Sequence, residues 1–309
     1  MKAFKSAIHV SSADLIHAGQ GAIARRRKAH LALALGLVFV VSMVFVAPWL
    51  GVTETRGTAM LVVTGVLALV CQYVDASLGM GYGTTLTPLL LALGFSPLDA
   101  VPAVLISQLA GGLVASACHH REGNVQFQWG SRQLKTALVL GALGAAGAII
   151  GVLTAVSLPA WILRIYIGLV VAGAGVLLLV APHFSGRVTW GRVAGLGLVA
   201  GANKGISGGG YGPLLTAGQA LIGQDPRSSV GITCLAEVVV CVVAFAMFLI
   251  SGRAIHVGLL LALVAGSVLS APLSAWTVRN AESRALRFAI AAMTIFLGGA
   301  AIVTGLLGL

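Results

Sequence analysis

This chain contains two copies of one segment, GMGYGTTLTPLL at residues 79–90 and GGGYGPLLTAGQ at residues 208–219. An offset of 129 residues aligns residues 75–99 with residues 204–228 without a gap, and 8 of the 25 aligned positions are identical. Each copy places a cluster of glycines between two apolar stretches. Glycine clusters also suit close helix packing, but a duplicated pair of interrupted apolar segments is typical of the binding site of a secondary transporter.

The composition is that of a membrane protein. Hydrophobic residues make up 58% of the 309 positions and charged residues only 9%, against about 25% charged residues in soluble domains. A spanning helix needs about 20 apolar residues. Nine stretches meet this length, at residues 31–50, 58–79, 98–118, 136–156, 160–181, 190–206, 229–251, 255–277 and 285–307. Residues 84–94 and 213–222 are apolar but shorter and predict half-helices. We therefore expect an all-α polytopic protein with about nine spans and two half-helices.

The net charge of +11 follows the predicted loops. Lys and Arg precede the first span and recur around residues 121–135, 187–192 and 279–287. The alternate loops hold little more than Arg56, Arg253 and, just inside a helix, Arg164. This asymmetry predicts a cytoplasmic N-terminus and an external C-terminus. It also accounts for the basic composition without a nucleic-acid partner. The expected partners are the lipid bilayer and a small anionic substrate, and a homodimer is left open.

The charge pattern divides the chain into four regions. They are a cytoplasmic tail at residues 1–30, an extra span with its outer loop at 31–57, and two transport repeats at 58–181 and 182–309. The first repeat starts outside and the second starts inside, which predicts an inverted repeat. In each repeat one helix dips in, unwinds at the glycines and returns through the half-helix. The first span is interpreted as an uncleaved anchor, because its 20 residues are long for a signal peptide.

Three ionisable residues lie well inside apolar spans: Asp75, Lys204 and Glu237. Such residues are costly in a membrane unless they are paired or hydrated, so each is a functional candidate. Asp75 and Lys204 occupy equivalent positions of the two copies and can form an ion pair near the centre. Such a pair can be a structural salt bridge between the two repeats; alternatively, Lys204 binds an anionic substrate. Glu237, the repeat partner of Gln108, is a candidate for proton coupling, as is Asp75; the alternative for Glu237 is a protonated structural residue.

The residues around the two breaks favour an anion. Half-helices beginning at Thr84 and Pro213 would present free N–H groups and positive dipole ends to the membrane centre. With Lys204 beside them, these ends resemble known anion sites. The predicted substrate site comprises Gln72, Asp75, Gly79, Gly81, Tyr82, Gly83, Thr84, Gln108, Asn203, Lys204, Ser207, Gly208, Gly209, Gly210 and Tyr211. We predict no cofactor, metal or catalytic residue. A metal site at His119 and His120 is not expected, because adjacent residues on a helix point in different directions.

A family resemblance rests on three segments: GMGYGTTLTPLLLALGFSPLDAV, SGGGYGPLLTAGQALIGQDPRSSVG and HHREGNV. They resemble the sulfite exporter TauE/SafE family of bacterial membrane permeases, over residues 58–307. The resemblance implies a multi-pass protein of the bacterial inner membrane that moves sulfite, organosulfonates such as sulfoacetate, or related small anions, with export as the expected direction. It also implies that residues 79–83 and 208–212 form paired substrate breaks. The chain departs from the family pattern at Asp75, Met80 and Pro213.

Alternatives to this reading remain. The nearest is an uptake permease or a channel for another small anion. A membrane enzyme would need a nucleophile and base, or a metal cluster, at one membrane depth, and the sequence offers neither. A structural or insertase subunit would not need duplicated half-helices.

Overall fold

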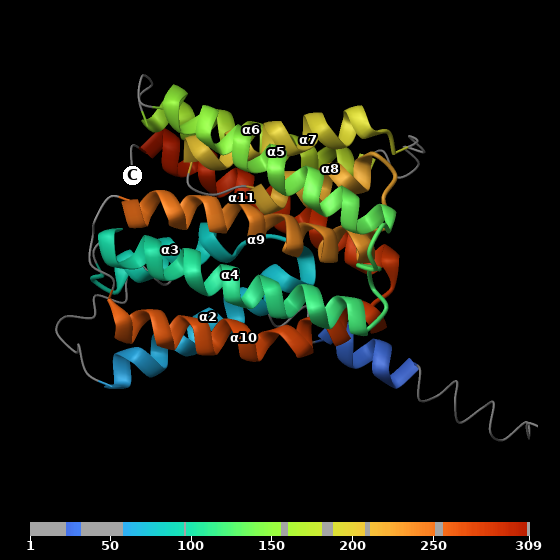
Figure 1. Cartoon of the computed structure of the whole chain (residues 1–309), viewed down its shortest axis with the longest axis horizontal. Helices are drawn as coiled ribbons and strands as arrows, with labels where there is room; N and C mark the ends of the chain where they lie inside the picture. Colours follow the sequence, from blue (N-terminus) through green and yellow to red (C-terminus); the bar gives the residue numbers. More distant parts are fainter. Residues whose placement is uncertain are drawn as a thin grey trace, which may run out of the picture.

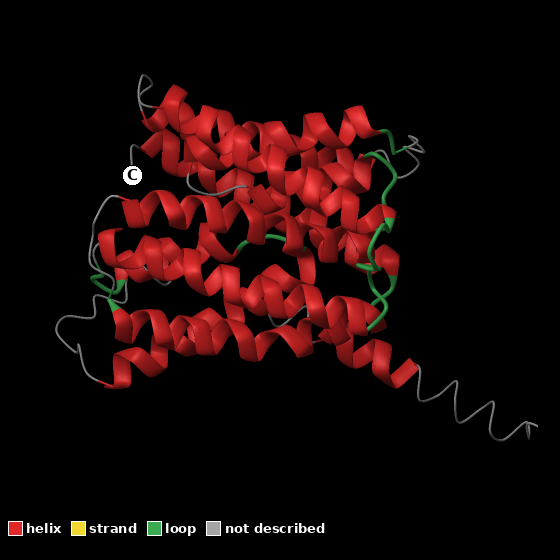
Figure 2. Ribbon diagram, in the orientation of Figure 1, coloured by secondary structure: helices red, strands yellow, loops and turns green. Residues whose placement is uncertain are grey.

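The computed structural model describes residues 23–31, 58–95, 97–155, 160–180, 188–207, 211–250 and 256–307. Within these ranges every regular element is a helix (Figure 2). Residues 23–31 form a helical segment that ends where the description stops, so most of the predicted first span lies outside the described residues. The other helices are α2 (Thr58–Leu78), α3 (Tyr82–Ala92), α4 (Pro97–Arg121), α5 (Arg132–Ala155), α6 (Ala160–Val180), α7 (Trp190–Ser207), α8 (Tyr211–Leu221), α9 (Pro226–Ile250), α10 (Val257–Asn280) and α11 (Ser283–Leu307).

Long apolar runs form long helices, as expected. In the part of the chain that the structure describes, α2, α4, α5, α9, α10 and α11 are long and apolar enough to cross a membrane. The two 11-residue helices, α3 and α8, occur where half-helices were predicted. They begin at Tyr82 and Tyr211, however, two residues before the predicted starts at Thr84 and Pro213. Pro213 is tolerated as the third residue of α8 because a first-turn residue has no intrahelical acceptor for its N–H.

The long helices stand side by side as a bundle (Figure 1). The most extensive contacts join α5 to α7, α6 to α11, and α10 to both α2 and α4, while α9 packs against α4 and α5. Glycines allow the closest approaches. A Cβ atom on Gly201 would overlap the Gly144 backbone between α7 and α5, and one on Gly266 would overlap the Gly65 carbonyl between α10 and α2.

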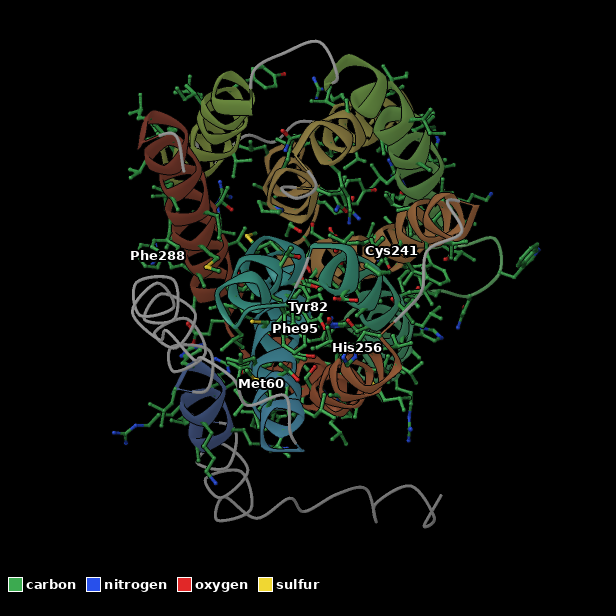
Figure 3. All side chains as sticks on the ribbon, turned by 90° about the vertical axis from the view of Figure 1, so that its left-hand side faces the viewer. Met60, Tyr82, Phe95, Cys241, His256 and Phe288 are labelled. Atoms are coloured by element: carbon green, nitrogen blue, oxygen red, sulfur yellow. The ribbon has the colours of Figure 1, made fainter. Side chains whose placement is uncertain are left out.

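The short helix α3 doubles back along α2. The beginning of α2 lies at the beginning of α10, where Leu61 adjoins Gly258. Just after α3, the ring of Phe95 meets the ring of His256 edge-on, with 6.1 Å between centroids. Figure 3 looks onto this face and labels Met60, Phe95 and His256. Since α2 starts and α3 ends at one face, the chain enters the bundle, turns at the first glycine break and returns.

The opposite face gathers the basic loops. The Arg26 guanidinium pairs with Glu282 at 3.2 Å, and Arg279 pairs with Glu122 at 2.9 Å. The Arg227 guanidinium donates to the carbonyl oxygen of the residue before Glu282, at 2.6 Å. The start of α9 and the α4–α5 and α10–α11 connections therefore meet at one end of the bundle, on the right in Figure 1.

Candidate functional site

The first glycine break is a turn that only glycine accommodates easily. The helix α2 ends with the N–H groups of Gly79 and Met80 donating to the Asp75 carbonyl, at 2.6 and 3.2 Å. Gly79 has φ +72° and Gly81 has φ +115°. L-residues with a side chain rarely adopt these angles. The two glycines thus end α2 and aim the chain back into α3.

This break packs directly against the half-helix of the second repeat. The Thr216 hydroxyl donates to the Gly79 carbonyl at 2.9 Å. An alanine Cβ at Gly212 would lie 2.6 Å from the Gly79 carbonyl oxygen and 2.9 Å from the Met80 Cα. The first break and α8 are therefore neighbours in the core. The second cluster, Gly208, Gly209 and Gly210, lies outside the described residues.

The side chain of Asp75, a residue of α2, lies at the N-terminus of α3. Its side chain is only 4% exposed. Its carboxylate accepts the Tyr82 backbone N–H at 3.1 Å and the Gln72 side-chain amide at 3.4 Å. A negative group is stabilised there by the unpaired N–H groups and the helix dipole. The chain's own carboxylate thus stands where one of the two predicted helix ends would receive an anion.

Lys204 pairs with Glu237 instead of Asp75. Its ammonium lies 2.9 Å from the Glu237 carboxylate, and the two side chains are 10% and 9% exposed. It also lies 5.5 Å from the centroid of the Tyr211 ring, at the start of α8, within cation–π range. The equivalence of Asp75 and Lys204 suggested a different pair. Lys204 pairs with Glu237 because α9 brings the Glu237 carboxylate to the end of α7. Asp75 is instead held by the Tyr82 backbone N–H and the Gln72 side-chain amide.

The three ionisable residues nevertheless form one buried cluster. Asp75 lies within electrostatic reach of both Lys204 and Glu237. Asn203, beside Lys204, is 3% exposed. The side-chain oxygen of Gln72, whose amide donates to Asp75, and the hydroxyl of Thr85 in α3 are buried and have no protein hydrogen-bond partner. The cluster therefore combines one cation, two carboxyl groups and buried neutral polar groups.

Other predicted site residues have structural contacts of their own. The Tyr82 hydroxyl is hydrogen-bonded to the Ser107 hydroxyl at 2.7 Å, and the Tyr211 hydroxyl donates to the Leu140 carbonyl at 3.0 Å. These two bonds anchor α3 to α4 and α8 to α5. The Gln108 side-chain oxygen accepts from the Cys241 thiol at 3.6 Å. The two tyrosine hydroxyls are thus committed to the scaffold, and the ring of Tyr211 is the part that faces Lys204.

The remaining predicted residues divide into two groups. Gly83 is open toward Gln108, whose side-chain oxygen would be 3.8 Å from an added Cβ. The side chains of Thr84 and Ser207 lie outside the described residues, although both positions are helical.

Sequence reasoning missed a polar link at the end of α2. His119 is fully buried, and its Nε2 donates to the Ala76 carbonyl at 2.8 Å. The Asn124 amide lies 3.0 Å from His119 Nδ1 and 2.8 Å from the Ala275 carbonyl, to which it donates. This link ties the end of α2 to α4 and α10. The HHREGN segment contains both residues, but its sequence does not indicate which backbone carbonyls of other helices they contact.

An apolar groove of about 470 Å³ lies elsewhere, between α2 and α10. Residues such as Leu61, Val66 and Leu269 line it, and none of the predicted site residues does. An apolar lining offers nothing to an anion. We therefore place the candidate site in the buried polar cluster around Lys204, Glu237 and Asp75.

Comparisons with known proteins agree with the resemblance seen in the sequence. A family model described as Sulfite exporter TauE/SafE matches residues 64–301. A curated relative, the "Probable membrane transporter protein YtnM" of Bacillus subtilis (strain 168), is 32% identical over 234 residues, which cover 71% of this chain and 75% of the relative. No solved structure matches the chain. The family match runs from α2 into α11 and contains the whole polar cluster.

Proposed function

Because the chain belongs to the sulfite exporter TauE/SafE family of membrane transporters, we propose that it is a secondary transporter of small sulfur-containing anions. Sulfite and organosulfonates such as sulfoacetate are the proposed substrates, and export across the bacterial inner membrane is the proposed direction. The observation that supports an anionic substrate most directly is the position of Lys204, a buried cation in the last turn of α7, before α8.

The chemistry of this junction suits an oxyanion. The ammonium of Lys204 supplies a charge, and the start of α8 supplies the positive end of a helix dipole. Buried neutral polar residues belong to the same region: Asn203 precedes Lys204 in α7, and the Gln72 amide donates to Asp75. Donors arranged around one cation can bind a compact anion with several oxygen atoms.

Helix packing supports an inverted repeat over residues 58–181 and 182–309. Under the 129-residue offset, α2 to α6 correspond to α7 to α11. The contact of α2 with α10 in one half then has its equivalent in the contact of α7 with α5 in the other. The contact of α4 with α10 likewise has its equivalent in that of α9 with α5. Two contacts, α4 with α9 and α6 with α11, join equivalent helices of the two repeats. Each of these contacts is extensive. Such a set is expected of two repeats related by a two-fold axis in the membrane plane.

The basic face supports the proposed orientation. The ion pairs at Arg26 and Arg279 lie at the end of the bundle where Arg132 and Arg227 also hold loops together. Positively charged loops remain preferentially in the cytoplasm. We therefore place this end, with the N-terminus, inside.

The proposal can be tested by thermal unfolding of the purified protein with added anions. Sulfite, methanesulfonate and sulfoacetate should raise the melting temperature, while acetate should not. Saturation at a hundred times Kd contributes about 2.7 kcal/mol. The double variant Lys204→Met/Glu237→Gln, which removes both charges together, should lose the response, and Lys135→Met at the exposed start of α5 should keep it. Stabilisation by carboxylates alone, or an undiminished response in the double variant, would contradict the proposed substrate class or site.

A further inference from the structure

The binding cation is already neutralised in this structure. The Lys204 ammonium and the Glu237 carboxylate are 2.9 Å apart, and both side chains are at least nine-tenths buried. An anion that binds Lys204 must enter this space. Two anions around one cation leave an uncompensated negative charge, and an unpaired charge in a low-dielectric interior costs several kcal/mol.

We propose that a substrate anion displaces Glu237 from Lys204, and that the released Glu237 carboxylate takes up one proton, so that one anion and one proton cross together. The inference rests on the proposed function. The exchange is balanced: the ion pair of Lys204 with Glu237 is replaced by an ion pair of Lys204 with the anion, and the proton from water forms the O–H bond of the neutral Glu237 carboxyl group.

Charge balance explains why the two events are joined. Asp75 keeps its neutral partners, the Gln72 amide and the Tyr82 N–H, so its charge is the same throughout and the balance concerns the groups that change. Without the anion, Lys204 and Glu237 sum to zero charge. With it, Lys204, a monovalent anion and protonated Glu237 also sum to zero, whereas each intermediate combination adds one charge within the membrane, which is costly. Only the empty and the doubly loaded forms can reorient at low cost, so Glu237 acts as a resident substitute for the substrate.

The surroundings of Glu237 favour this role for it over Asp75. Asp75 is retained by the Tyr82 N–H and the Gln72 amide, neither of which changes charge. Glu237 has as its hydrogen-bond partner a cation, the Lys204 ammonium, which a substrate anion can also attract. The repeat equivalent of Glu237 is Gln108, so a neutral side chain of the same shape already occupies the matching position of the other repeat.

The ionisable groups near Glu237 are few. Lys204 comes from α7, Tyr211 from α8 and Asp75 from α2, while Cys234 and Cys241 belong to α9 itself. The other helices packed against α9 are α4, α5 and α11, and their ionisable residues lie near helix ends. These residues are Asp99, Cys118, His119, His120 and Arg121 on α4, Arg132 and Lys135 on α5, and Arg284 and Arg287 on α11. None of these end groups substitutes for Glu237 beside Lys204.

Coupling of this kind has a consequence for direction. An anion that moves with a proton distributes like its undissociated acid. Net export then requires the inside-to-outside ratio of the anion to exceed the outside-to-inside ratio of the proton. Under the usual inward proton gradient, the protein exports a metabolite only when it accumulates in the cytoplasm, and otherwise favours uptake.

Isothermal titration calorimetry counts the proton directly. Methanesulfonate is a suitable probe because it remains a monovalent anion across the neutral pH range. Titrations at one pH in buffers of different ionisation enthalpy should give an uptake of about one proton per anion bound by the wild-type protein. The wild-type Kd should then rise about tenfold for each unit of increasing pH, because ionised Glu237 competes for Lys204.

Three variants sharpen the test. Glu237→Gln should bind methanesulfonate more tightly than wild type, with no proton uptake and no dependence on pH. Glu237→Asp keeps the carboxyl group and should keep the proton. Glu122→Gln, which removes a carboxylate from a surface ion pair, is the matched control and should behave as wild type.

The outcomes separate the two proposals. Binding by the wild type without proton uptake overturns the coupling and leaves the substrate class standing. Unchanged proton uptake in Glu237→Gln, or its loss in Asp75→Asn with retention in Glu237→Gln, overturns the assignment to Glu237. Failure of the wild type to bind methanesulfonate, sulfite or sulfoacetate overturns the proposed function, and the coupling with it.

Discussion

Replacing Gly212 with alanine should destabilise the protein, whereas the same change at Gly83 should not. Both glycines lie in the first turn of a half-helix, one position after the repeated tyrosine. At Gly212 the new Cβ would lie 2.6 Å from the Gly79 carbonyl oxygen and 2.9 Å from the Met80 Cα. Both are backbone atoms, so α8 and the first break must separate.

The size of the effect follows from overpacking. An extra methyl group in a closely packed core costs about 1–3 kcal/mol. Alanine also gains up to ~1 kcal/mol over glycine in a helix, and both variants share this gain. At Gly83 the nearest atom is the Gln108 side-chain oxygen at 3.8 Å, an ordinary contact. The melting temperatures of the two variants should therefore differ by roughly 2–10 °C.

A thiol-reactive fluorescent dye can follow this unfolding in detergent, because Cys71, Cys234 and Cys241 are buried and unoxidised. Gly212→Ala should release fluorescence at a lower temperature than wild type, and Gly83→Ala at the wild-type temperature or slightly above it, because only the helix-propensity gain remains there. Equal melting temperatures for the two variants would refute direct packing of the first break against α8. Gly81→Ala provides a second comparison, because its φ of +115° makes any side chain strained.

Two further predictions concern single contacts, and a third concerns the topology. Lys204→Met should lower the free energy of unfolding by up to about 3–5 kcal/mol, with the largest loss at high pH, where the unpaired Glu237 cannot take up a proton; the double variant with Glu237→Gln should recover most of the loss, and failure to recover would argue against the pair. Asn124→Leu should cost about 1–3 kcal/mol through lost buried hydrogen bonds, measured by the same unfolding assay; a neutral effect would exclude the link at the end of α2. Cysteines placed at Trp129 and Val257, both exposed, should react with an impermeant reagent from the cytoplasmic and external sides respectively, and labelling from one common side would contradict the topology.

The helices were predictable because the membrane imposes their length. An apolar run of about 20 residues has one common outcome in a bilayer, and the shorter runs after each glycine cluster could only be half-helices. Their first residues were less predictable. The left-handed turn at Gly81 lets Tyr82 join the helix directly, so α3 begins before Thr84.

The sequence identifies the three buried ionisable residues but does not predict how they pair. Buried charge in a membrane identifies Asp75, Lys204 and Glu237 whatever the fold. Repeat symmetry relates Asp75 to Lys204 but says nothing about which neighbour each one contacts. The pair of Lys204 with Glu237 depends on how α9 lies against the end of α7, and that arrangement comes from packing across the whole bundle.

Counterflow in proteoliposomes tests transport at this site. Vesicles loaded with unlabelled sulfite and diluted into a trace of radiolabelled sulfite should accumulate the label when they contain the wild-type protein or Lys135→Met. Vesicles with Lys204→Met/Glu237→Gln should accumulate no more than protein-free vesicles, once the protein is shown to be folded by the dye assay. Counterflow by that double variant at the wild-type rate would contradict transport through the Lys204 site.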